Sequence, residues 1–67
     1  MRIIINGKER EFPSLQNLTE LLRELEISSP HFAVAVNHQV VPKSRYQETA
    51  IREGDKIEIV HAVGGGL

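Results

Sequence analysis

The last five residues of the chain, Val63-Gly64-Gly65-Gly66-Leu67, could supply chemistry through a carboxylate carried on a glycine. Ordering a residue costs about 1–2 kcal/mol of backbone entropy, glycine costs the most, and no side chain packs in return. We therefore predict a flexible C-terminal glycine tail over residues 64–67. Four extended residues reach about 13 Å. The tail could thus carry its carboxylate into the active site of another protein.

A carboxylate at Gly66 would need a partner to activate it, as a mixed anhydride with AMP, because a free carboxylate is a poor acyl donor. The chain offers no ATP site of its own, since neither a helix nor the Lys-Ser/Thr pair of a phosphate-binding loop follows the glycines. A flexible end without function is the simpler explanation of the composition alone. The position of the glycines directly after an apolar run favours a functional tail.

Few side chains could act as catalysts or metal ligands. His31, His38 and His61 lack the short spacings of a zinc site, and the chain has no cysteine for a thiolate ligand or nucleophile. Ser44 and His38 could begin a nucleophilic triad, but no glycine-flanked turn or oxyanion loop accompanies them. We predict no metal site and no catalytic residue, and an enzyme using His38 or His61 as a base is the weakest alternative.

Length and composition indicate one small globular domain. The chain has 67 residues, a size at which folding buries roughly 60% of the surface of the unfolded chain. Hydrophobic residues make up 40% and charged residues 25%, too apolar a mixture for a disordered protein. The net charge of −1 argues against nucleic-acid and membrane partners. Because no signal or membrane-spanning segment is recognisable, we expect a cytoplasmic protein.

The first part of the chain is typical of a hairpin followed by a helix. Residues 2–5 form a β-branched run, Asn6-Gly7 suits a two-residue turn, and a second strand should cover about residues 8–12. Leucines at positions 18, 21, 22 and 25 share one helical face. We expect Asn17 to cap this helix, Glu20 to complete a capping box, and the helix to end near residue 25 or 26.

The second part predicts three more strands. Residues 32–36 alternate larger and smaller apolar side chains, as a central strand does. A turn is expected at residues 37–39 and a short edge strand at 40–42, because Pro42 cannot donate to a ladder. An irregular crossing segment should follow at 43–51, and the last strand at 56–63.

This order of elements predicts an α+β fold of the β-grasp type, a mixed sheet of four to five strands with one helix packed on one face. The domain should span residues 1–63, with the first and last strands side by side in the middle. The helix leaves the other face of the sheet uncovered, and an apolar patch there usually marks a contact surface. The residues expected on this partner-docking face are Ile4, Ala33, Ala35, Val60 and Ala62.

A resemblance to a known family covers essentially the whole chain. It is most specific in three stretches of the second half: Val34-Ala35-Val36-Asn37, Val41-Pro42-x-Ser44, and Gly54-Asp55-x-Ile57-Glu58-Ile59-Val60-x-Ala62-Val63-Gly64-Gly65. These stretches, the start Ile5-Asn6-Gly7-Lys8 and the leucine helix resemble the ThiS family, the sulfur carrier proteins of thiamine biosynthesis.

The resemblance implies a ubiquitin-like β-grasp protein whose terminal glycine is adenylated by an E1-like adenylyltransferase that uses ATP and Mg. Sulfur from a cysteine desulfurase relay then converts the adenylate to a thiocarboxylate. Thiazole synthase uses that sulfur to build the thiazole precursor of thiamine. On this reading the chain is a protein co-substrate rather than an enzyme, and it binds no cofactor itself.

Leu67 departs from the family pattern, in which the chain ends at the glycines. We expect that a peptidase removes Leu67 or that recombinant expression added it, which leaves Gly66 as the sulfur-carrying residue with Gly64 and Gly65 as the flexible thread. A protein that no longer carries sulfur is the third option. Two other functions stay open: a carrier of the molybdopterin type, and an interaction module that binds through the apolar face without covalent chemistry.

Overall fold

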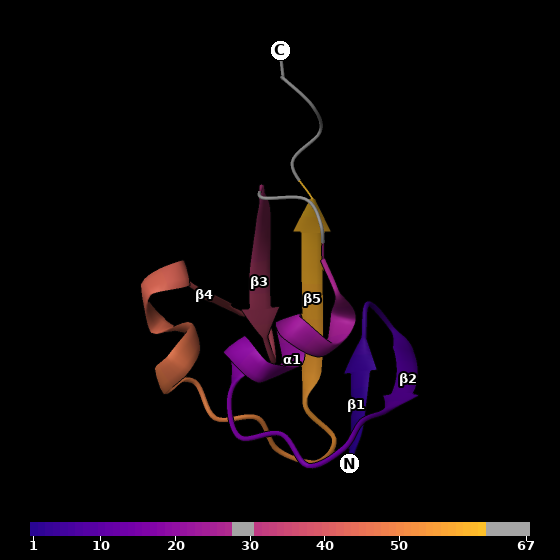
Figure 1. The fold of residues 1–67 in the computed structure, drawn as a ribbon. Helices are drawn as coiled ribbons and strands as arrows, with labels where there is room; N and C mark the ends of the chain where they lie inside the picture. The colour runs from indigo at the N-terminus through magenta and orange to yellow at the C-terminus, as the bar shows by residue number, and fades with distance from the viewer. Residues whose placement is uncertain (28–30, 62–67) are drawn as a thin grey trace.

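The computed structural model describes residues 1–27 and 31–61 of the chain. Within these residues, five strands form one mixed sheet and a single α-helix lies across one face of it (Figure 1). The elements follow in the order β1 (Arg2–Ile5), β2 (Lys8–Glu11), α1 (Leu18–Leu25), β3 (Phe32–Val36), β4 (Gln39–Val41), the 3-10 helix η1 (Lys43–Glu48) and β5 (Lys56–His61).

The sheet has the strand order β2-β1-β5-β3-β4, so the last strand lies in the middle, next to the first (Figure 1). β5 runs parallel to β1 and antiparallel to β3, and hairpins join β1 to β2 and β3 to β4. These pairings confirm the predicted fold. The last two residues of the strand predicted at 56–63 lie outside the described residues, and so does the predicted boundary between domain and tail.

Both hairpins turn through two residues with left-handed backbone. The φ angles are 48° and 83° at Asn6 and Gly7, which confirms the first predicted turn, and 50° and 71° at Asn37 and His38. The predicted turn over residues 37–39 is therefore one residue too long. Asparagine and histidine enter the left-handed region more readily than most side chains, so a tight turn forms without glycine.

Two other predicted boundaries differ from the structure. Pro42 lies outside β4 and precedes η1, and the first six residues of the segment expected to be irregular form that 3-10 helix. β2 ends at Glu11, one residue earlier than predicted. The following Phe12 is buried in the core. Its side chain thus packs with the interior instead of extending the charged edge strand.

The ends of α1 form as their residues predict. Asn17 is the N-cap, and its Oδ1 accepts a hydrogen bond of 3.0 Å from the backbone N–H of Glu20. The Glu20 carboxylate reaches back to the backbone N–H of Gln16 at 2.8 Å, one residue before the N-cap position that a capping box would use. Glu26 ends the helix in a left-handed conformation. No helix in the described ranges is long and apolar enough to cross a membrane.

The core lies between α1 and the sheet. Of the four leucines on the predicted helical face, Leu18 and Leu21 are fully buried, while Leu22 and Leu25 are half-buried and pack against the core. The buried apolar side chains are Ile3, Ile5, Phe12, Leu15, Leu18, Leu21, Val34, Ile51, Ile57 and Ile59. Alternate residues of β1, β3 and β5 thus face the helix, which fixes the residues left for the opposite face.

Candidate functional site

The face of the sheet turned away from α1, hereafter the open face, carries four of the five residues predicted to dock a partner. Ala33 lies opposite Val60 in the ladder between β3 and β5, and paired residues share a face. Ala35 follows on the same face of β3, and Ile4 lies on the same face of β1. Ala62, the fifth predicted residue, lies outside the described residues.

Val40 also belongs to the open face, although the sequence analysis did not select it. The two-residue turn pairs Val40 with Ala35, so the two side chains share the open face. With a turn over residues 37–39, Val40 would face the other side, because a shift of one residue exchanges the faces of a strand. Val40 is 71% exposed and Val60 66%, and they are the large exposed hydrophobic residues of the described part.

Two grooves divide the open face. The valine groove is lined by Ala33, Val34, Ala35, Val40, Glu58 and Val60. The Ile4 groove is lined by Ile4, Gly7, His38, Lys56, Ile57 and Glu58. Ile4 is therefore set apart from the other predicted docking residues. Glu58 lines both grooves, so its carboxylate lies between an apolar groove and one of mixed polarity.

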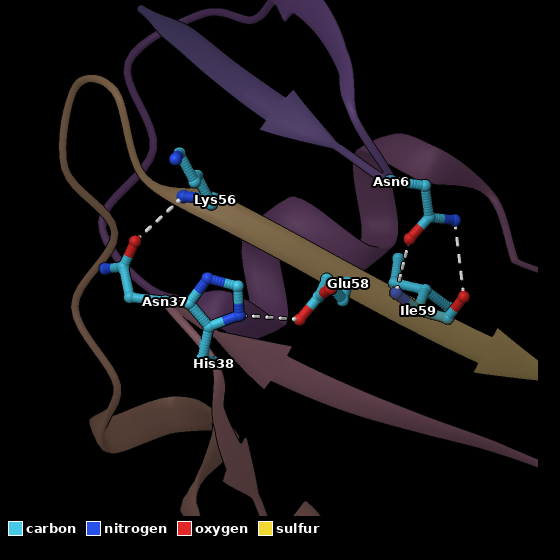
Figure 2. Close-up of polar contacts among 6 residues, drawn as sticks. All are labelled: Asn6, Asn37, His38, Lys56, Glu58 and Ile59. Atoms are coloured by element: carbon cyan, nitrogen blue, oxygen red, sulfur yellow. Dashed lines mark hydrogen bonds and ion pairs between the residues drawn. The ribbon is translucent and has the colours of Figure 1, made fainter.

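Two turn asparagines hold β5, the strand that leads toward the glycine tail (Figure 2). The Asn6 Oδ1 accepts a hydrogen bond of 2.8 Å from the backbone N–H of Ile59, and the Asn6 Nδ2 donates to the Ile59 carbonyl at 3.3 Å. From the other side, the Asn37 Oδ1 accepts from the backbone N–H of Lys56 at 3.1 Å. Because β1 ends at Ile5, the Asn6 side chain takes the place of a further ladder residue beside β5. The strand is thus fixed close to its end.

Asn6→Ala is expected to lower the free energy of unfolding by about 2–3 kcal/mol, because it removes both bonds to Ile59 and places an alanine in left-handed backbone. Asn6→Gly is the matched control, since it removes the same bonds but tolerates the backbone. Urea unfolding should rank the stabilities as wild type, then Asn6→Gly, then Asn6→Ala. Equal stability of Asn6→Gly and wild type would show that the side-chain bonds contribute nothing.

The three histidines do not come together. His38 Nδ1 lies 3.5 Å from the Glu58 carboxylate, His61 makes a tilted ring contact with Phe32 at 6.2 Å between centroids, and His31 is exposed at the start of β3. In the ranges 1–27 and 31–61, no group of three or more metal-ligating side chains gathers. Burial raises the pKa of Tyr46, which packs against the core. The described residues thus offer a surface for binding, and the carboxylate chemistry predicted from the sequence is assigned to the tail.

The residues predicted to carry that chemistry, Gly64, Gly65 and Gly66, and the departing Leu67 lie outside the described residues. In the sequence, the glycines begin three residues after His61, the last residue of β5. The strand that precedes them is the central one, paired on both sides. Its start pairs with β1, and its residues 57–61 pair with β3.

The fold and the sequence both match known proteins. The chain is 46% identical over 66 residues to the thiazole synthase of Paramagnetospirillum magneticum, covering 98% of this chain but only 20% of that protein. It is 29% identical to the sulfur carrier protein ThiS of Escherichia coli, covering 98% of this chain and 100% of that protein. The crystal structure of the thiamine biosynthesis protein ThiS from Geobacter metallireducens superposes with a TM-score of 0.85 at 29% identity, covering 98% and 100% of the two chains.

The chain thus spans about a fifth of the thiazole synthase and the full length of the carrier protein. The model of the ThiS family matches residues 3–66, which is nearly the whole sequence and includes the glycines. The expected resemblance is confirmed by these matches and by the shared β-grasp fold. The chain belongs to the ThiS family.

Proposed function

We propose that this chain is a sulfur carrier protein of thiamine biosynthesis and that the carboxylate of Gly66, exposed after loss of Leu67, carries the sulfur. The observation that supports this most is a family match that extends through the glycines on a β-grasp domain. A relative of the same length is named a sulfur carrier protein, and a solved relative a thiamine biosynthesis protein. The chain acts as a protein co-substrate and catalyses no step itself.

The proposed chemistry has two steps, both at the terminal carboxylate. A carboxylate oxygen attacks the α-phosphorus of ATP in an E1-like adenylyltransferase, pyrophosphate leaves, and an acyl adenylate forms. Hydrosulfide then attacks the acyl carbon and AMP leaves, which yields the thiocarboxylate; where the sulfur arrives as a persulfide, a thiol first reduces it to hydrosulfide and is left as a disulfide. ATP and Mg belong to the activating enzyme, and a cysteine desulfurase relay supplies the sulfur. Glycine suits this role because it lets the carboxylate enter a narrow site.

Thiazole synthase is the proposed acceptor of the sulfur. The thiazole synthase relative contains a counterpart of nearly this entire chain within one polypeptide. Joining a carrier to its acceptor raises the effective concentration of one for the other, which suits successive steps of one reaction. The described surface that could meet these partners is the open face, and we place the protein in the cytoplasm with them.

The mass of the variant lacking Leu67 is expected to rise by the difference between a sulfur and an oxygen atom, because sulfur replaces one oxygen of the terminal carboxylate. It is incubated with the adenylyltransferase of the same organism, ATP, Mg and sulfide, and its intact mass is then measured. A reaction without ATP serves as the control, because no acyl adenylate forms there. An unchanged mass in the complete reaction contradicts the proposal.

A further inference from the structure

Glu58 lies at the centre of the open face, on β5 between the valine groove and the Ile4 groove. Its ladder partner is Ala35, and its neighbours on the same face of the strand are Lys56 and Val60. Its side chain is 51% exposed. A charged group thus occupies the middle of the surface on which the largest exposed apolar side chains of the described part lie.

Within the chain, Glu58 is paired only loosely. The His38 ring points toward it from the turn between β3 and β4, with 3.5 Å between Nδ1 and Oε1 (Figure 2). In the described residues, Glu58 forms no other ion pair, although Lys56 lies on the same face. The His38 side chain is 77% exposed. Exposed pairs of this kind add little to stability, so Glu58 can exchange this partner for another at small cost.

Among the other charges on this face, Arg2 is already paired, whereas Lys56, two residues from Glu58 on β5, forms no ion pair in the described residues. Arg2 and Glu9 lie on the same face of β1 and β2 and form an ion pair of 3.0 Å between Nε and Oε2. A protein that covers both grooves would take Glu58 out of water. A carboxylate without water requires a positive charge or several donors, and histidine supplies a full charge only when protonated. His38 alone therefore does not compensate Glu58 in a docked complex.

We infer that the protein bound on the open face brings a lysine or arginine side chain to Glu58, flanked by apolar groups that fill the two grooves. The occupant is thiazole synthase, because the relative that contains a counterpart of this chain is a thiazole synthase and must bring the two parts together. This inference rests on the proposed function. It adds the chemistry by which the two proteins recognise each other: His38 holds Glu58 in the free carrier and the partner's cation takes its place on docking.

The test compares the affinity of the full chain and its variants for the thiazole synthase of the same organism by titration calorimetry. Glu58→Gln is expected to weaken binding about tenfold or more, and Glu58→Lys to weaken it further, because like charges would then meet. The dependence of binding on salt should also become shallower in Glu58→Gln, since one attractive charge pair is lost. Glu24→Gln, the same change on the exposed side of α1, is the matched control and should bind like wild type.

His38→Asn separates the docking role from a structural one, because asparagine keeps the left-handed turn and removes the imidazole. It should leave binding unchanged or tighten it, since the partner's cation then meets no competitor. Equal affinities of Glu58→Gln and Glu24→Gln overturn the inference, as does a loss in His38→Asn that matches that in Glu58→Gln. So does self-association of the chain that Glu58→Gln abolishes, because a second copy would then occupy the face.

The same titration distinguishes this inference from the proposed function. If the wild-type chain does not bind the synthase, both the inference and the proposed transfer of sulfur to thiazole synthase are contradicted. If the wild-type chain binds and Glu58→Gln binds equally well, only the inference about Glu58 is contradicted. Circular dichroism of each variant confirms that the fold is intact, and Glu58 lies outside the core, so the substitution removes no buried contact.

Discussion

Deleting residues 64–67 is expected to abolish sulfur transfer completely while the domain remains folded. Within residues 1–27 and 31–61, the buried core residues lie between Ile3 and Ile59, so the deletion leaves all of this packing in place. It removes the glycine carboxylate on which the proposed acyl chemistry takes place. The shortened chain should no longer complement a thiamine-requiring strain. Its midpoint of thermal unfolding should be unchanged.

The variant that lacks only Leu67 is the matched control, because it keeps all three glycines and should complement fully. The carrier function and the interaction-module function predict opposite results for the shortened chain. An interaction module that acts through Ile4, Val60 and Ala62, as predicted from the sequence, needs no tail and should complement without residues 64–67. Complementation by the shortened chain would therefore contradict the carrier function and favour a binding role for the open face.

Leu21→Ala is expected to lower the free energy of unfolding by about 2–5 kcal/mol, the loss typical of a fully buried leucine. Leu21 is 0% exposed and belongs to the core between α1 and the sheet. At roughly 0.05–0.15 kcal/mol per residue, the total stability of a domain of this size is itself only several kcal/mol. The variant should therefore be partly or wholly unfolded at moderate temperature, as chemical denaturation will measure.

Leu22→Ala is the matched control for this prediction, because Leu22 lies on the same helix but is only half-buried. The same chemical change there removes less apolar surface from the interior, so the loss should be clearly smaller. Equal losses at the two positions would mean that burial does not set the size of the effect. Since alanine is a better helix former than leucine, propensity alone would even stabilise the variants slightly.

Much of the fold could be predicted because it follows from rules that act over a few residues. The Asn6-Gly7 dipeptide specifies its turn, Asn17 specifies the start of the helix, and the leucine spacing specifies the buried helical face. The turn at Asn37 and His38 contains no glycine, so its length was mispredicted. Because the turn is one residue shorter than predicted, Val40 pairs with Ala35 and lies on the open face, within the candidate docking surface.

The sequence by itself determined the elements, their order and the glycine tail, because periodicity, capping and backbone freedom are properties of neighbouring residues. Only the tertiary structure decided which distant residues meet. Asn6 bonds to Ile59 across a separation of 53 positions, and Glu58 meets His38 at the junction of two grooves. These contacts depend on strand register and on the closure of long loops. Both are set only when the strands of the whole sheet pair. The proposed carboxylate site thus follows from the sequence, whereas the open face proposed to dock a partner exists only in the folded sheet.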